Sequence, residues 1–553
     1  MNEGSTMTFI QQTNTTIKTK SKNFDCIVIG SGFGGSVSAL RLAEKGYRVL
    51  VIEKGRWYKK PKDFPNTNWN LPKWMWLPQI NFRGPFKMSF FRHVTIMSGV
   101  GVGGGSLVYA NTLPVPKDSF FEAKSWGSLA NWKIELSEHY KTAQKMLGAT
   151  TNNYFTKTDS VFKEIAADIG RADSFHPVDV GVFLGKPGKT VKDPFFDGKG
   201  PDRKGCIYCG GCMLGCQHNA KNSLDKNYLH LSIGLGTQVK AETNVTDVTQ
   251  LSDGSYQISA SERLSLFRKK DHIFNAKKVI FAGGVLGTVP LLLKLKATKS
   301  LPLLSSRLGQ FIRTNNEAII GVTSHNGSDN FTEGLAISSI IHTSDDSHLE
   351  PVRYPPGSGF FRILLAPHAP GKNVFIRIST LLRSWLKNPI KWLKVMTVKD
   401  FAKSSQILLY MQSLDGTLSF KMGRNLFTFF RKGMISKIER GAPPAAFMKE
   451  ATKLSMLFAQ KTSGMVQNLF TETLFNIPST AHILGGCCMG KDTNEGVINH
   501  KHEVFGYKNM YIIDGSSMSA NPGVNPSLTI TAMSERAMSF IPTKPGAKQS
   551  DKS

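Results

Sequence analysis

Four of the seven cysteines in this 553-residue chain lie between residues 206 and 216. Their spacing, C-x2-C-x2-C-x3-C over Cys206, Cys209, Cys212 and Cys216, is the spacing with which bacterial ferredoxins hold an iron–sulfur cluster. The next residue is Gln217, where the ferredoxin run has proline. The residues leave two interpretations open: an iron–sulfur cluster, or a tight glycine–cysteine loop whose small residues let the backbone pack closely. A zinc site is less favoured, because structural zinc sites usually pair two spaced knuckles.

A second group of chemically capable residues lies near the end of the chain. His482 stands ahead of a glycine pair in AHILGGCCMG, and a predicted strand ends at Asp514. A loop with Asn525 and a helix opening near Pro526 follow. A histidine has a pKa near neutrality, which suits a general base. A buried histidine with ordinary hydrogen bonds is the equally weighted alternative for His482.

The front of the chain predicts a dinucleotide site. An apolar run over 24–30 indicates a buried strand, and GSGFGG then places Gly30, Gly32 and Gly35 in G-x-G-x-x-G order. A helical pattern and a second strand ending at Glu53 follow. The first glycine permits a tight turn, the second lets the backbone approach a pyrophosphate, and the third lets helix and strand pack closely. Because an acid at Glu53 can accept ribose hydroxyls, the pattern favours FAD or NAD over NADP.

A further glycine-rich segment spans residues 97–111, MSGVGVGGGSLVYAN. Its glycines leave room for a flat ring or another backbone to lie close. The apolar residues between them favour a packed loop over a flexible one.

Length and composition limit the remaining possibilities. A chain of 553 residues with 40% hydrophobic and 20% charged residues predicts a globular protein of two or more domains. The few clustered cysteines indicate a reducing compartment, and we expect a cytoplasmic protein with a disordered tail over residues 1–20. The apolar run over 279–293 is broken by glycines and a proline, so we expect no transmembrane helix. The net charge of +29 favours an anionic partner, but no nucleic-acid signature is present, and we expect no nucleic acid.

Four separated motifs together resemble those of the glucose–methanol–choline (GMC) oxidoreductases. They are the G-x-G-x-x-G front, GVGGGSLVYAN, HILGGCCMG and DGSSMSANPGVNPSLTITAMSER. Within that family the chain is most similar to cholesterol oxidase-like FAD flavoproteins, over nearly its whole length from about residue 23 to 542. Those proteins are described as FAD enzymes without a cluster, and they carry a segment similar to the cysteine run.

The resemblance implies an α/β plus α+β fold. A Rossmann-like FAD-binding domain would be assembled from discontinuous segments, at about 21–135, 200–300 and 476–545. An antiparallel-sheet domain over 136–199 and 301–475 would cover the substrate.

The resemblance also implies site residues. His482 and Asn525 would be catalytic, and the cofactor would be bound by Gly30, Gly32, Phe33, Gly34, Gly35, Glu53, Gly103, Gly104, Gly105, Ser106, Asn111, Asp514, Gly515, Asn525 and Pro526. No metal site is expected.

The implied reaction is the oxidation of an alcohol. His482 would take the hydroxyl proton, Asn525 would orient the oxygen, and hydride would pass to flavin N5. A hydrophobic secondary alcohol is expected as substrate, most of all a 3β-hydroxysteroid such as cholesterol, with oxygen or another electron acceptor. Cholesterol oxidases also use a carboxylate near the substrate, for which Glu317 is a weak candidate. The alternatives are an enzyme for long-chain alcohols or sugars, a flavin/iron–sulfur electron-transfer protein, and a lyase of the same family.

Two stretches bear on the substrate. Residues 56–92 hold four of the eight tryptophans among prolines, which predicts an ordered loop: either core filler or, preferably, a lid over an apolar substrate.

In residues 379–396, one helical stripe is apolar and lies beside a basic stripe. The apolar stripe consists of Leu382, Leu386, Ile390 and Leu393. That pattern is typical of a helix on an anionic bilayer, with Trp385 and Trp392 at the headgroups, and equally of an ordinary surface helix. We expect Pro389 to kink it.

Overall fold

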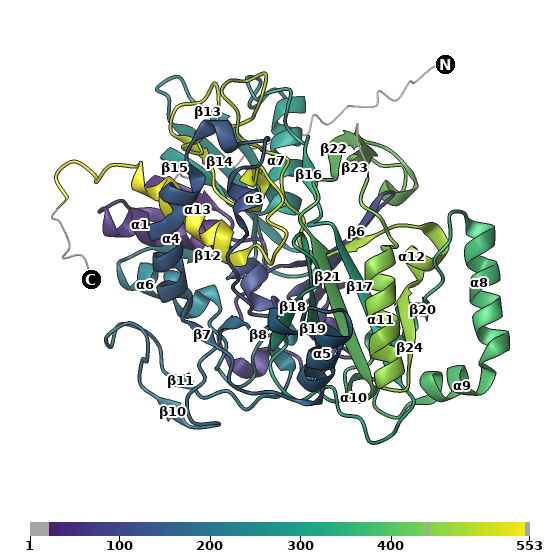
Figure 1. Cartoon of the computed structure of the whole chain (residues 1–553). Helices are drawn as coiled ribbons and strands as arrows, with labels where there is room; N and C mark the ends of the chain where they lie inside the picture. Colours follow the sequence, from purple (N-terminus) through teal and green to yellow (C-terminus); the bar gives the residue numbers. More distant parts are fainter. Residues whose placement is uncertain (1–21, 440–442, 548–553) are drawn as a thin grey trace, which may run out of the picture.

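The computed structural model describes residues 22–439 and 443–547, so the tail expected over residues 1–20 lies outside the described residues. Two seven-stranded sheets organise this part of the chain, one on each side of the view in Figure 1. The first is mainly parallel and the second is antiparallel. The α/β plus α+β fold expected from the sequence is therefore confirmed.

The first sheet has the strand order β12-β2-β1-β15-β14-β13, with β26 paired to β15. Its strands are β1 Lys22–Ile29, β2 Val49–Ile52, β12 Gln238–Lys240, β13 Thr243–Gln250, β14 Tyr256–Arg263, β15 Lys269–Phe281 and β26 Met510–Ile512. Three distant parts of the sequence thus share one sheet. The run AKKVIFAGG forms the end of β15 and the turn that leads into α7 (Val285–Ala297).

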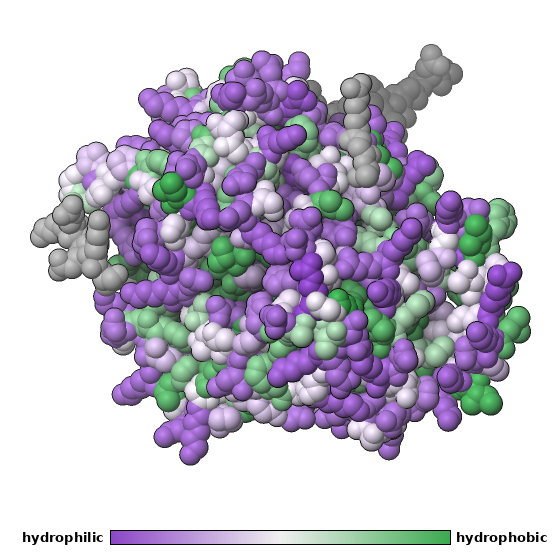
Figure 2. All heavy atoms as spheres, in the orientation of Figure 1, coloured by the Kyte–Doolittle hydropathy of each residue, from purple (hydrophilic) through white to green (hydrophobic). Residues whose placement is uncertain are grey.

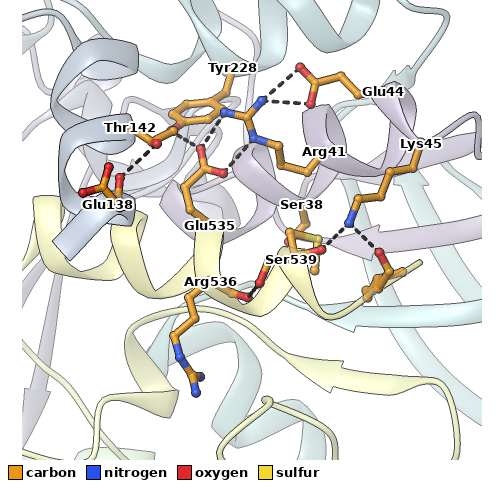
Figure 3. Close-up of polar contacts among 12 residues, drawn as sticks. Ser38, Arg41, Glu44, Lys45, Glu138, Thr142, Tyr228, Glu535, Arg536 and Ser539 are labelled. Atoms are coloured by element: carbon orange, nitrogen blue, oxygen red, sulfur yellow. Dashed lines mark hydrogen bonds and ion pairs between the residues drawn. The ribbon is translucent and has the colours of Figure 1, made fainter. Parts of the chain in front are cut away.

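Helices α1 (Phe33–Glu44), α4 (Trp132–Leu147), α6 (Tyr228–Gly234) and α13 (Ser527–Ser539) pack around this sheet. Figure 3 shows polar contacts that join α1, α6 and α13. Arg41 on α1 pairs with Glu535 on α13 at 2.7 Å, and the Tyr228 hydroxyl donates to the same carboxylate at 2.6 Å. Because Glu535 is buried, this network fixes how the C-terminal helix lies against the first one.

The second sheet has the order β20-β24-β17-β21-β19-β18-β8. Its strands are β8 Phe175–Pro177, β17 Glu317–Ser324, β18 Ser339–His342, β19 Ser347–Val352, β20 Leu365–Pro367, β21 Ser405–Gln412 and β24 Gly464–Leu469. Successive side chains of a strand point to opposite faces. On β21, Leu408 and Tyr410 pack with α5 (Lys157–Asp168) and α11 (Lys449–Lys461), whereas Ile407 and Leu409 line a cavity on the other face. The apolar run EAIIGVTS forms β17.

The packing does not follow the expected domain boundaries everywhere. Helix α4 contacts α13 and contributes Trp132 and Leu136 to the core of the first sheet, although it lies mostly within the segment expected to belong to the substrate side. Leu418 and Phe420, on β22 (Thr417–Gly423), join the same core, and β22 forms a small sheet with β16 (Ile312–Arg313) and β23 (Gly433–Ile438). The two expected domains are therefore seen as two sheets. Segments expected on the substrate side, such as α4 and β22, pack in the core of the first sheet.

A pair of helices with an exposed apolar stripe, which we call the arm, follows β20. The chain returns to the second sheet through α10 (Phe401–Ser404). The arm consists of α8 (Val374–Lys387) and α9 (Pro389–Thr397), which stand at the edge of the molecule in Figure 1. Pro389 begins the second helix, so the expected kink is a complete break at Asn388. Among the described residues, no helix is long and apolar enough to cross a membrane.

Candidate active site

A cavity of about 650 Å³ lies between the two sheets. Residues of the first sheet, its glycine-rich loops and the C-terminal segment form one side, among them Gly30, Glu53, Asp514 and Pro526. The cavity-facing side chains of the second sheet form the other, among them Ile319, Ile337, Val352, Ile407 and Leu409. Of the residues implied by the resemblance, those in the wall are Gly30, Gly32, Phe33, Gly34, Glu53, Gly104, Gly105, Asn111, His482, Asp514, Gly515, Asn525 and Pro526.

The first glycine-rich turn has the geometry that a bound dinucleotide needs. Gly30 has φ +108°, and a Cβ there would lie 2.4 Å from the Ala282 carbonyl oxygen. A Cβ on Gly35 would lie 2.1 Å from the Gly30 oxygen, so this glycine permits the close packing of α1 on β1. At Gly32, by contrast, the nearest atom to a Cβ is 4.0 Å away, which leaves open space beside the backbone. The start of α1 has no side-chain cap and faces this space, as a phosphate site requires.

Glu53 ends β2 and is almost completely buried in the cavity wall. One carboxylate oxygen accepts from the Ser31 hydroxyl at 2.7 Å and its backbone N–H at 3.1 Å. The other accepts from the N–H of Gly55 at 2.8 Å. The oxygen that accepts only from Gly55 can accept a further hydrogen bond, so Glu53 both shapes the turn and can bind a ribose hydroxyl.

The second glycine-rich segment lies directly on the first. A Cβ on Gly104 would come within 2.6 Å of the Gly32 Cα, and the Gly103 N–H donates to the Ser31 hydroxyl at 3.2 Å. Gly103 and Ser106 do not reach the cavity wall, because the Ser106 hydroxyl is turned inward. It donates to the Gly103 carbonyl at 2.7 Å and accepts from the Leu224 N–H at 3.0 Å.

Asn111 ends this segment in the cavity wall, fully buried, with a positive φ of 73°. Within the described parts of the chain its side-chain amide interacts with the Cys212 thiol, a weak partner, and has no nitrogen or oxygen partner. A buried amide with only a weak partner is costly, so a ligand group in the cavity is expected to satisfy it.

The C-terminal segment brings a helix N-terminus to the cavity. Asp514 is buried, and its carboxylate accepts from the Gly284 N–H, the Thr288 hydroxyl and the N–H of Ser516 at 2.6–2.8 Å. Asp514 therefore ties β26 to α7. Helix α13 begins after Pro526 with no side-chain cap, and Pro526 and Ser527 line the cavity, so the positive end of its dipole favours a negative group there.

His482 is held by a buried carboxylate of the second sheet. Its Nδ1 lies 2.6 Å from Glu317 Oε2, and the other Glu317 oxygen accepts from the His482 backbone N–H at 3.2 Å. Burial by itself would lower the pKa of the imidazole, but the Glu317 carboxylate raises that pKa above its ordinary value. Because Nδ1–H donates to Glu317, Nε2 keeps its lone pair. His482 lines the cavity, so Nε2 is placed where it could accept a proton from a bound group.

Glu350, on β19, is a second buried carboxylate beside the site that the sequence did not single out. Among the described residues, its carboxylate interacts with the Asn525 amide and has no other hydrogen-bond donor. Burial raises the pKa of Glu350 to about 8, against the opposite effects of His482 and of the Asn525 amide. The only sequence signal was an acid in the apolar run SHLEPV, which alternation alone does not separate from an ordinary strand residue.

The residues present fit FAD. The wall runs from Glu53 over the start of α1 and the two glycine-rich loops to His482 and Asn525. Open backbone at Gly32, an uncapped helix start, and buried polar groups without a nitrogen or oxygen partner at Asn111 and Asn525 Oδ1 are what a flavin dinucleotide would cover. Ribose, pyrophosphate and ring would then occupy successive parts of the wall.

The cysteine run forms a compact loop against the second glycine-rich segment. A Cβ on Gly210 would lie 2.4 Å from the Thr332 oxygen, and one on Gly215 would lie 2.0 Å from the Phe64 ring. The buried ammonium of Lys221 donates to the carbonyl oxygens of Leu107, Tyr109 and Cys212 at 2.8–3.0 Å. This close packing is what the glycine–cysteine loop interpretation requires. In the described parts of the chain, no group of three or more His, Cys, Asp or Glu side chains is placed to hold a metal ion.

The tryptophan-rich segment, residues 56–92, is partly buried and partly exposed, so it is neither core filler alone nor a lid alone. Trp74 is fully buried and stacks on Phe86 at 4.6 Å, while Trp69 is half exposed. Phe86 and Asn68 line the cavity, and the Asn68 amide oxygen accepts from the N–H groups of Gly359 and Phe360 at 2.9 Å. The segment thus contributes Phe86 and Asn68 to the cavity wall, while its tryptophans lie outside the wall.

Three family models match parts of this chain. A model described as GMC oxidoreductase matches residues 199–306, and a second with the same description matches residues 436–534. A model of an NAD(P)-binding Rossmann-like domain matches residues 28–57.

Whole-length relatives agree with these matches. The chain is 42% identical to a cholesterol oxidase of Acinetobacter baumannii, over 94% of this chain and 95% of the relative. It is 41% identical to a cholesterol oxidase of Mycobacterium tuberculosis, over 94% and 92%. A long-chain-alcohol oxidase of Arabidopsis thaliana is 22% identical, over 92% of this chain and 66% of the relative. The crystal structure of pyridoxine 4-oxidase from Mesorbium loti has the same fold, with a TM-score of 0.58 at 14% identity, over 93% of this chain and 99% of that one.

Proposed function

Because the chain belongs to the GMC oxidoreductases, FAD-dependent enzymes that act on CH–OH groups, we propose that it oxidises a secondary alcohol on a hydrophobic molecule. The substrate is a 3β-hydroxysteroid such as cholesterol, the product is the ketone, and oxygen is the electron acceptor. The observation that carries the proposal is the His482–Glu317 pair at the end of a cavity walled by apolar side chains.

The character of the cavity favours a steroid over a sugar. The second-sheet side of the wall is aliphatic and aromatic, with Phe361, Leu365, Phe401 and Leu409 in addition to the isoleucines. A sugar would leave its hydroxyls unpaired against such a wall, and unpaired buried polar groups are costly. The relatives named cholesterol oxidase are 41–42% identical, against 22% for the long-chain-alcohol oxidase.

Bound FAD supplies the hydride acceptor, and the residues of this chain handle the proton. The substrate hydroxyl lies between His482 Nε2 and the Asn525 amide. Nε2 takes the hydroxyl proton while Glu317 holds Nδ1–H, fixes the tautomer and stabilises the imidazolium that forms. As the O–H bond breaks, the carbinol C–H bonding pair leaves with its hydrogen, and the carbon–oxygen double bond forms.

Glu350 is the carboxylate that we assign to the substrate side of this reaction. It is buried beside Asn525 and close enough to His482 for their charges to interact, whereas Glu317 is fully engaged with the His482 ring and backbone. In its ionised form Glu350 is thus able to receive the proton that His482 collects.

Anaerobic mixing with a panel of alcohols tests the proposed substrate class. We expect a 3β-hydroxysteroid in detergent to bleach the flavin absorbance faster than a long-chain primary alcohol or a sugar. Bleaching only by the primary alcohol or only by the sugar would replace the steroid with that class. Iron and acid-labile sulfide in the purified protein would instead favour the electron-transfer alternative.

We further propose that the protein is cytoplasmic and docks on anionic membranes through the arm of α8 and α9. Its apolar stripe faces outward: the exposed fractions of Leu386 and Ile390 are 81% and 69%, and Leu382 and Leu393 are also exposed. Figure 2 shows apolar and polar residues alternating along this edge of the molecule. Trp392 is buried, so the expectation that it lies at the headgroups is wrong; its indole donates to Ser384 on α8 and holds the two helices together.

Charge and position support a lipid surface as the occupant. No Asp or Glu stands between Glu350 and Asp400, whereas Arg383, Lys387, Lys391 and Lys394 are exposed on the arm. Each basic residue near an anionic surface contributes about 1 kcal/mol of attraction. Leu365, just before the arm, and Phe401, just after it, both line the cavity. A bilayer under the arm would therefore lie next to the cavity that receives the hydrophobic alcohol.

Vesicle co-sedimentation tests the docking surface. Wild type should bind vesicles that contain anionic phospholipid and leave them at high salt. Changing Arg383, Lys387, Lys391 and Lys394 to Glu should abolish binding, and Leu386→Ser with Ile390→Ser should weaken it. The matched control changes four exposed lysines of the loop around β10 (Thr190–Val191) to Glu: Lys186, Lys189, Lys192 and Lys199. Equal loss of binding in the control, or a dimer formed through the arm, would contradict the proposal.

A further inference from the structure

Three of the thirteen histidines lie in a row across neighbouring strands of the second sheet, and the row ends at Glu350. His348 lies two residues before Glu350 on β19, so both side chains point to the same face. His342 on β18 is the direct cross-strand partner of His348, and β8, which carries His176, pairs with β18. This histidine ladder runs from a buried carboxylate to an exposed side chain.

The side chains of the ladder approach one another in sequence. His348 Nε2 lies 3.7 Å from Glu350 Oε1. The rings of His348 and His342 have centroids 6.0 Å apart, and those of His342 and His176 are 5.5 Å apart. The last pair is in contact through Nε2 of each ring, at 3.4 Å. The exposed fraction rises along the ladder: His348 is buried, His342 is half-buried and His176 is exposed.

The inner members have unsatisfied polar atoms. Within the described residues, His348 Nε2 and His342 Nδ1 have no hydrogen-bond partner, and the Glu350 carboxylate interacts only with the Asn525 amide. Ordinary core histidines satisfy their ring nitrogens, because each unpaired buried group is costly. A row of such atoms between a site and the surface is instead suited to exchange protons through small ring movements or single bridging waters.

We propose that His348, His342 and His176 conduct the substrate proton from Glu350 to solvent. The inference rests on the proposed function, in which one proton remains on the protein for each alcohol oxidised. The substrate gives two electrons and one hydrogen as hydride to the flavin and one proton to His482. That proton passes to Glu350, then along the ladder, and leaves at His176. No further oxidant or reductant is needed.

The charges around the ladder keep its imidazoles neutral at rest, as a relay needs. Burial, together with the neighbouring His342, Lys117, His482 and His176, lowers the pKa of His348 to about 3. Burial, Lys117, His176 and Arg171 lower the pKa of His342 to about 4. A neutral imidazole accepts a proton at one nitrogen and donates at the other, so it passes a proton without staying charged. Near the exposed end of the ladder, Lys117 donates to the Asp345 carbonyl oxygen and Arg171 donates to the Asp345 carboxylate.

The first test follows protons and flavin in the same anaerobic reaction. A pH-indicator dye reports release to solvent while the flavin absorbance reports hydride transfer. In His342→Gln and His176→Gln variants we expect flavin bleaching at the wild-type rate but proton release slowed by about 10²-fold or more, the scale of a lost proton-transfer group. Added imidazole should restore release. His218→Gln, a partly buried histidine outside the ladder, is the matched control. Proton release that keeps pace with bleaching in both ladder variants would overturn the proposal.

A second measurement needs no alcohol and therefore separates the relay from the proposed function. After mixing with D₂O below pH 8, infrared spectroscopy follows deuteration of the Glu350 carboxyl group, identified as the band that Glu350→Gln removes. We expect His348→Gln and His342→Gln to slow this exchange and His218→Gln to leave it unchanged. Equal exchange rates in all of them would overturn the relay, whereas a flavin that no alcohol bleaches would overturn only the proposed function.

Discussion

His482→Ala is expected to slow reduction of the flavin by the alcohol by 10²–10⁴-fold, which is the usual cost of losing a general base. The hydroxyl proton would then have no acceptor at the position of Nε2, because Glu317 contacts the ring on its other nitrogen. FAD should remain bound, since the glycine turns and Glu53 that fit the dinucleotide form another part of the wall. Anaerobic stopped-flow absorbance measures the rate, and the flavin spectrum of the purified variant measures retention.

His218→Ala is the matched control for this prediction, because it removes a partly buried histidine that lies outside the main cavity. It should reduce its flavin at the wild-type rate. If His482→Ala also kept that rate, His482 would be a structural residue and the assignment of the base would be wrong.

Glu350→Gln is the second change with a large expected effect. Glutamine keeps the shape of the side chain but can neither take nor hold a proton, so we expect slower flavin reduction on the same 10²–10⁴-fold scale. The pH dependence should change as well. In wild type the rate should rise with pH as His482, whose pKa is raised, and Glu350, with a pKa of about 8, lose their protons. The variant should lose the upper of the two apparent steps, which belong to the coupled pair.

Glu472→Gln tests whether any buried carboxylate would give this result. Burial raises the pKa of Glu472 to about 7, and its carboxylate accepts from the Ser479 N–H at 3.0 Å, outside the cavity wall. We expect a change in thermal stability and little change in the rate of reduction. A rate loss as large as that of Glu350→Gln would show that the effect is one of stability.

The sequence was most informative where a residue type has a local mechanical reason. Gly30 and Gly35 predicted the turn and the close packing of α1, because both depend on backbone geometry within a few residues. The apolar stripe of 382–393 predicted an amphipathic helix, but not that its apolar side faces outward, which depends on what packs beside it.

Contacts between residues far apart in the sequence could not be predicted from local sequence patterns. Glu317 and His482 are 165 residues apart and meet only because β17 lies next to the segment that carries the histidine. Glu350 gave no local signal, since an acid on a strand is as compatible with an exposed position as with a buried one. His176, His342 and His348 share a sheet face only through the strand order β8-β18-β19. Charged and titratable groups of a site are therefore recognised from tertiary packing, whereas glycine turns are recognised from sequence.

The most direct test of the central claim is an anaerobic single-turnover comparison of two epimers on the wild-type protein. A 3β-hydroxysteroid and its 3α epimer have the same solubility class and differ in the position of one hydroxyl relative to His482 and Asn525. We predict that the 3β epimer bleaches the flavin with formation of one 3-ketosteroid per FAD, and that the 3α epimer reacts far more slowly. A flavin that neither steroid bleaches, but that a long-chain primary alcohol or a sugar does, would contradict the account.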